Sequence, residues 1–170
     1  MNKKKFLWLF VLCCALPLLA AKLVLEFGWF NRGVSSQGEW QQNEVFLLAP
    51  TTEKAHWRIG VMPAAECAAQ CRDALHTVQQ LYIGLGRKQA QVQPVLISPD
   101  AASSDYSAFK QQPPVATVPT ALHNKILLID QQGLVLLSYP MPTAKTDMAD
   151  TARAIRQDLL KLLNYDRTSV

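Results

Sequence analysis

The chain has 170 residues, of which 49% are apolar and 18% are charged, and its formal net charge is +4. This length allows one domain of ordinary size plus a terminal segment, and the apolar content excludes a wholly disordered chain. The charge is mild, and Lys3, Lys4 and Lys5 lie together at the N-terminus. Because no basic stripe interleaved with aromatic residues follows them, we expect no nucleic-acid partner.

An uncharged apolar run, Phe6 to Ala21, follows these lysines. A helix that crosses a bilayer needs about 20 mostly apolar residues, and residues 6–27 reach that length if Lys22 and Glu26 extend toward the headgroups. Lysines stay on the cytoplasmic side of such a helix. The pattern therefore predicts a single-pass bacterial inner-membrane anchor over residues 1–30, with a cytoplasmic N-terminus and a periplasmic C-terminal domain.

The sequence supports two alternatives for this N-terminal segment, a cleaved signal peptide and a lipoprotein anchor, less well. A cleaved signal peptide needs a small-x-small site, and "LLAA" supplies alanine only at its end. A lipoprotein needs a small residue before its cysteine, whereas Leu12 precedes Cys13. Cys13 and Cys14 fall inside the apolar run, where they are expected to act as small apolar side chains.

The remaining chain alternates between strand-like and helix-like patterns. Residues 31–54 are polar and turn-rich, and we expect a linker there with one edge strand over 45–49. "HWRIGVM" then predicts a strand that ends at Pro63, and apolar residues at three- and four-residue steps predict a helix from Ala64 to about Leu85.

The second half of the chain is expected to contain three strands and a helix. The runs are a strand over 90–98, an irregular or short helical stretch over 99–114, a β-hairpin over 125–140 and an amphipathic helix over 146–163. Two strands joined through a helix run parallel by a right-handed crossover, and a hairpin adds antiparallel strands. The order predicts an α/β domain over residues 55–166, with a mixed sheet and helices on both of its faces.

A cysteine pair, Cys67 and Cys71, lies where the first strand gives way to the first helix. This arrangement resembles the thioredoxin fold. The sequence "VPT", residues 118–120, resembles the place where thioredoxin-like proteins keep a cis-proline beside their cysteines, which makes Pro119 the cis-proline candidate.

The Cys-x-x-x-Cys spacing, together with His123 in "ALHNKILLIDQQG", resembles the Sco/SenC family of copper chaperones for cytochrome c oxidase assembly. That resemblance implies copper as cofactor and Cys67, Cys71 and His123 as its ligands. It also implies an oxidase subunit or another assembly factor as partner. Ala68 and Leu122 stand where family members usually have proline and aspartate, so the chain resembles a divergent proteobacterial inner-membrane relative.

The chemistry of Cys67 and Cys71 allows three functions. Four residues make about one helical turn, so both side chains are expected on one helix face, a few Å apart. Thiolates select Cu(I), an added imidazole allows Cu(II) as well, and a helix N-terminus favours the thiolate for metal binding and thiol–disulfide exchange alike. In an oxidising compartment the pair would also form a disulfide, redox-active or purely structural.

These alternatives define three hypotheses for the whole protein. It is a membrane-tethered copper chaperone or assembly factor, a thiol–disulfide oxidoreductase, or a non-catalytic interaction module. Because the chain has no phosphate-binding loop, metalloprotease helix or serine-nucleophile motif, thiol–disulfide exchange is the enzymatic activity that it could have.

Overall fold

The computed structural model describes residues 3–26, 36–52, 57–64, 67–98 and 106–166. The chain divides into two compact units, Met1–Ser35 and Ser36–Val170. In the first unit, α1 (Lys3–Glu26) is a single helix of 24 residues. Within the described residues, no helix combines the length and apolar character that crossing a membrane requires. The predicted transmembrane span is therefore not confirmed.

The described part of the second unit contains a six-stranded mixed sheet in the order β1-β6-β5-β2-β3-β4. β2 pairs parallel with β3 and antiparallel with β5, and β5 pairs antiparallel with β6. This is the predicted crossover followed by the predicted hairpin. The strands are β1 (Glu39–Trp40), β2 (Trp57–Met62), β3 (Val92–Ile97), β4 (Lys110–Gln112), β5 (Lys125–Ile129) and β6 (Val135–Pro140).

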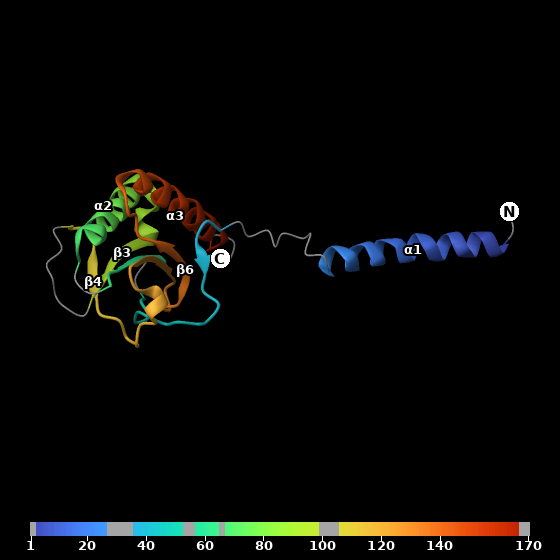
Figure 1. Ribbon diagram of the computed structural model, residues 1–170, viewed down its shortest axis with the longest axis horizontal. Coiled ribbons are helices and arrows are strands. Elements are labelled where there is room, and N and C mark those ends of the chain that lie inside the picture. The colour runs from blue at the N-terminus through green and yellow to red at the C-terminus, as the bar shows by residue number, and fades with distance from the viewer. Residues whose placement is uncertain (1–2, 27–35, 53–56, 65–66, 99–105, 167–170) are drawn as a thin grey trace. The chain divides into compact units, whose positions relative to one another are not determined.

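Two long helices, α2 (Ala69–Gly84) and α3 (Lys145–Asp166), lie side by side on one face of the sheet (Figure 1). Trp57, Ile59 and Val61 of β2 point to this face, where they join the larger apolar core with residues of both helices. Alternation along a strand sends the neighbouring side chains to the opposite face. Every residue of β2 is buried, which agrees with its central place in the sheet.

Among the described residues, irregular segments rather than long helices cover the second face. Leu47, Leu48 and Leu122 pack there against Met62 and Ile97, forming a smaller apolar core. The 3-10 helix η2 (Thr120–Leu122) supplies one of these residues. The expectation of helices on both faces was therefore wrong, because short loop segments with a few buried leucines cover this face instead.

Part of the expected linker belongs to the folded domain. The compact unit starts at Ser36, β1 pairs with β6, and Phe46 forms a bridge with Leu134. The boundary predicted at residue 55 therefore lies inside this unit, because the apolar residues near position 47 are core residues. Positions 31–35 and 53–54 of the expected linker lie outside the described residues.

Other boundaries differ by a few residues from the expected ones. α2 begins at Ala69 rather than at Ala64, and the C-terminal helix extends to Asp166. β4 lies in the stretch expected to be irregular and pairs parallel with β3 at the sheet edge. Two 3-10 helices, η1 (Gly86–Gln91) and η2, complete the described elements.

Candidate functional site

Cys67 and Cys71 are joined by a disulfide between the end of β2 and the start of α2. Cys67 lies outside the helix, because the N-cap residue Ala68 has extended backbone dihedral angles, φ −75° and ψ −167°. The expectation that both cysteines share a helix face was therefore wrong. The extended residue brings the two Cα atoms to 5.0 Å, a separation within the usual range for disulfides.

The two sulfur-bearing residues differ in burial. Cys71 is 3% exposed and belongs to the larger core, whereas Cys67 is half-buried and packs against the rim of that core. A partner molecule can therefore approach Cys67 more readily than Cys71. The remaining cysteines, Cys13 and Cys14, are free and exposed in α1.

The N-terminus of α2 carries the partial positive charge of the helix dipole, and Cys71 of the disulfide lies in its first turn. Within the described residues no side chain caps it, and its first turn contains no acidic residue. The aligned peptide dipoles of a helix stabilise negative charge at this end. This dipole favours a thiolate released in the first turn, whereas the burial of Cys71 in the apolar core opposes it.

His123 lies at the same end of the sheet as the disulfide. It follows η2, and its backbone N–H donates to the carbonyl of Thr120 at 3.2 Å. Two residues later Lys125 pairs with Met62, the last residue of β2. Cys67 comes five residues after Met62 in the sequence, so the histidine and the disulfide are attached at the same end of two paired central strands.

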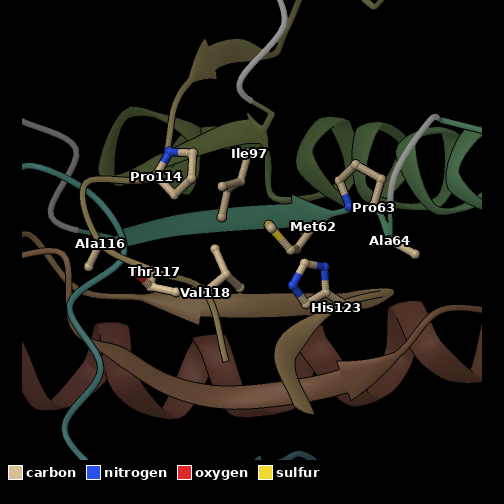
Figure 2. A pocket seen from close by; sticks show the side chains of 9 residues that line it. All are labelled: Met62, Pro63, Ala64, Ile97, Pro114, Ala116, Thr117, Val118 and His123. Carbon is tan, nitrogen blue, oxygen red and sulfur yellow. The ribbon is translucent and has the colours of Figure 1, made fainter. Parts of the chain in front are cut away.

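A cavity of about 420 Å³ opens at this end of β2 and β5. Figure 2 shows the imidazole of His123 and the side chain of Met62 turned toward the same space. The walls are mainly apolar, so His123 is the titratable side chain that lines the cavity. The lining residues are Met62, Pro63, Ala64, Ile97, Pro114, Ala116, Thr117, Val118 and His123.

The predicted copper ligands do not form a metal site in this state. Among the described residues there is no group of three or more histidine, cysteine, aspartate or glutamate side chains that could hold a metal ion. Cys67 and Cys71 are bonded to each other, whereas copper is held by thiolates. The disulfide form therefore does not fit copper.

Pro119 has another role than the one expected from the thioredoxin resemblance. No peptide bond in the described part of the chain is cis, so the cis-proline prediction was wrong. Pro119 is instead the N-cap of η2, with φ −59° and ψ 138°. Its carbonyl accepts the N–H of Leu122 at 3.0 Å. A trans proline suits this position because its fixed φ matches the start of a 3-10 turn.

Two polar residues of the site were not predicted from the sequence. The Gln70 side chain, between the cysteines, accepts a hydrogen bond from Asn124 Nδ2 at 2.9 Å and donates one to the Met141 carbonyl at 3.3 Å. Asn124 has a positive φ of 58°. An asparagine directly before a strand is a weak sequence signal for this backbone conformation.

Residues 57–166 match the model of a protein family described as "Transmembrane-like, thioredoxin-like, C-terminal domain". A search among curated proteins found no match. These residues include β2 to β6, both long helices and the disulfide.

Several solved structures are similar to this chain. An apo Sco1 protein from Thermus thermophilus is 14% identical, with 76% of this chain and 99% of that chain covered and a TM-score of 0.49. A SCO1/SenC family lipoprotein from Bacillus anthracis is 15% identical, with 68% and 95% covered and a TM-score of 0.39. The exposed lipoprotein thioredoxin Etrx1 from Streptococcus pneumoniae is 13% identical, with 65% and 98% covered and a TM-score of 0.37.

Proposed function

The chain belongs to the family of transmembrane-like, thioredoxin-like C-terminal domains, and from this premise we propose that it exchanges disulfides with a cysteine pair of an exported partner protein. The observation that carries the proposal is the unequal burial of Cys67 and Cys71, which are joined by a disulfide. An accessible sulfur can be attacked, and the sulfur that leaves, that of Cys71, lies in the first turn of α2, whose dipole stabilises a departing thiolate.

The exchange proceeds in two substitutions at sulfur. A partner thiolate attacks Cys67 Sγ, the bond to Cys71 breaks, and Cys71 leaves as a thiolate that takes a proton from water. The partner's second thiolate then attacks the partner's sulfur in the mixed disulfide and releases the Cys67 thiolate, which also takes a proton from water. Two electrons and two protons pass from the partner's dithiol to the pair, and the partner leaves with a disulfide. The reverse steps oxidise the pair.

A purely structural disulfide is the alternative, and the small size of the ring argues against it. The cysteines are four residues apart in the sequence. In the chain-entropy model such a short loop contributes about 2 kcal/mol to stability, less than longer loops do. The domain also has two apolar cores that hold the sheet in place without this bond.

The proposal also includes a compartment and a partner. A disulfide persists in an oxidising compartment, so we place the domain in the periplasm, anchored through the apolar N-terminal segment to the inner membrane. The resemblance to the Sco/SenC family suggests that the partner is a cytochrome oxidase subunit or another assembly factor. Its copper-binding cysteines would be the pair that exchanges with Cys67, and the reverse steps would keep them in the reduced form that binds copper.

Copper carriage is the second candidate function. It is favoured by the position of His123, which precedes β5 at the end of the sheet where β2 leads into the segment that carries Cys67. Reduction of the disulfide would supply two thiolates near an imidazole, a donor set that suits Cu(I). In this case copper would be cargo of the reduced protein, delivered to an oxidase subunit.

The exchange proposal is tested on the full-length protein with Cys13→Ala and Cys14→Ala, here called the two-cysteine protein. Variants with Cys71→Ser or Cys67→Ser are reduced and then mixed with oxidised glutathione, and the mixed disulfide is followed by mass spectrometry. We expect Cys67 to react at least tenfold faster than Cys71, because Cys71 is buried. Equal rates, or no adduct at Cys67, would contradict the proposal.

A further inference from the structure

The side chain of Gln70 connects the disulfide-bearing turn to two other parts of the site. Its Oε1 atom accepts a hydrogen bond from Asn124, in the residue pair that joins η2 to β5. Its Nε2 atom donates to the carbonyl of Met141, directly after β6. The first turn of α2 is thus connected to the two residues that flank the hairpin, directly before β5 and directly after β6.

We propose that Gln70 and Asn124 are positioning residues whose hydrogen bond sets the redox equilibrium of the Cys67–Cys71 pair. The inference rests on the proposed exchange function. It means that two residues other than the cysteines help to determine how readily the cysteine pair is reduced. Neither side chain is bonded to a sulfur atom, so both act through the backbone that carries the cysteines.

The start of α2 depends on this bond, because the usual stabilisation of a helix N-terminus is missing. Ala68, at the N-cap, provides no side-chain acceptor, whereas serine, threonine, aspartate and asparagine normally do so. The backbone bond from Arg72 N–H to the Ala68 carbonyl, at 3.1 Å, closes the first turn. The Gln70 carboxamide connects this turn to the residues on either side of the hairpin.

The backbone of Asn124 shows that the loop is held in a demanding conformation. Its φ of 58° makes it the non-glycine residue with positive φ in the described part of the chain. Such a conformation costs free energy and persists where the surroundings enforce it. His123, the preceding residue, lines the cavity, so the same bond also fixes the imidazole relative to the turn with the cysteines.

The effect on the redox equilibrium has a definite sign. In the disulfide form, the sulfur–sulfur bond already holds Cys67 against the start of α2. In the dithiol form this covalent restraint is absent, so the Gln70–Asn124 bond contributes more to holding the first turn and keeping the two thiols close together. Loss of this bond loosens the first turn mainly in the dithiol form, so it favours the reduced state.

The test uses the two-cysteine protein in glutathione redox buffers, with the reduced fraction measured by alkylation and mass spectrometry. Gln70→Leu removes both hydrogen bonds at similar side-chain volume, and Asn124→Gly removes the donor while glycine accepts the positive φ. Each variant should shift the equilibrium constant about threefold to tenfold toward the reduced form, as expected for one hydrogen bond. The double variant should shift it no further than the larger single effect.

Gln80→Leu is the matched control, because Gln80 is an exposed residue of the same helix. It should leave the equilibrium constant within twofold of the parent value. A purely structural role for Gln70 would lower the melting temperature and leave the equilibrium constant unchanged. If Gln70→Leu does not fold, Asn124→Gly still tests the same hydrogen bond, because it removes the donor in the loop.

Two results would overturn the inference. One is an equilibrium constant within twofold of the parent value in both single variants, and the other is a double variant whose shift is the product of the single shifts. Either result, with a parent protein that exchanges normally, leaves the proposed function intact. A parent protein that does not equilibrate with glutathione contradicts both proposals.

Discussion

The carboxylate of Asp158 in α3 accepts a hydrogen bond from the Tyr139 hydroxyl of β6 at 2.9 Å, and both side chains are 2% exposed. The same oxygen, Oδ2, accepts the backbone N–H groups of Gln37 at 2.7 Å and Gly38 at 2.9 Å. One buried oxygen therefore joins the C-terminal helix, the sheet and the segment that enters the domain. Asp158 Oδ1 lies 3.4 Å from Lys161 Nζ, which neutralises part of its charge.

Replacing Asp158 should destabilise the domain strongly. Asp158→Ala leaves one hydroxyl and two N–H groups without their acceptor, and we expect a loss of about 2–4 kcal/mol in the free energy of unfolding, measured in urea. Tyr139→Phe removes one of these bonds and should cost about 1 kcal/mol. Asp150→Ala, an exposed position on the same helix, is the control. A loss from Asp158→Ala no larger than that from Tyr139→Phe would contradict this assignment.

Tyr139 should also make stability depend on alkaline pH. Burial, and then the charge and hydrogen bond of Asp158, raise the pKa of the Tyr139 hydroxyl well above its usual value of 10. Below about pH 10 the hydroxyl is protonated in both states, so its contribution is fully present. Above pH 10 the unfolded state loses the proton while the folded state keeps it, so stability falls as the pH rises.

The matched comparison for this pH effect is the Tyr139→Phe variant. Between pH 9 and pH 11, the free energy of unfolding should fall by about 1.4 kcal/mol more in the parent protein than in the variant. The other tyrosines contribute equally to both proteins and cancel in the difference. Parallel stability curves over this range would show that the hydroxyl titrates normally in the folded state.

The order of the main elements could be predicted from the sequence because the apolar periodicity is clear in each. β2 reads as a short apolar run that ends at Pro63, and α3 repeats apolar residues at helical spacing. The hairpin has two apolar runs around a turn with Gly133. These signals are local in the chain, so neighbouring residues suffice to interpret them.

Contacts between distant residues could not be predicted in this way. Gln37 and Asp158 are 121 positions apart, and Gln70 and Asn124 are 54 positions apart. Nothing in the local pattern of either residue indicates its partner. Likewise, the extended backbone of Ala68 that takes Cys67 out of the helix is not a property that alanine itself favours.

The turn between β5 and β6 requires glycine at position 133. Its φ is +91°, and a Cβ atom there would collide with the backbone carbonyl oxygen of Leu48. This oxygen is backbone and cannot swing away as a flexible side chain would. Gly133 also accepts the N–H of Leu47 at 2.9 Å, so the turn holds the segment that covers the second face of the sheet.

Gly133→Ala should therefore cost more than about 2 kcal/mol, since it combines backbone strain with a collision. Gly84→Ala is the opposite case, because a Cβ atom at the end of α2 has no neighbour within 4 Å. Alanine is the better helix former, so this variant should gain about 0.5 kcal/mol. Urea denaturation measures both. Similar stabilities of the two variants would show that the turn can rearrange.

Copper uptake should depend on the redox state of the cysteine pair. The oxidised two-cysteine protein offers no thiolate because its sulfurs are bonded, so it should take up no Cu(I) in competition with a colorimetric chelator. The reduced protein should take up one Cu(I), and His123→Ala should weaken this uptake at least tenfold, since thiolates and imidazole are both suitable ligands. His76→Ala, an exposed histidine of α2, is the matched control. Equal uptake by the His123 and His76 variants would remove His123 from the site, and no uptake by the reduced protein would leave disulfide exchange as the function of the pair.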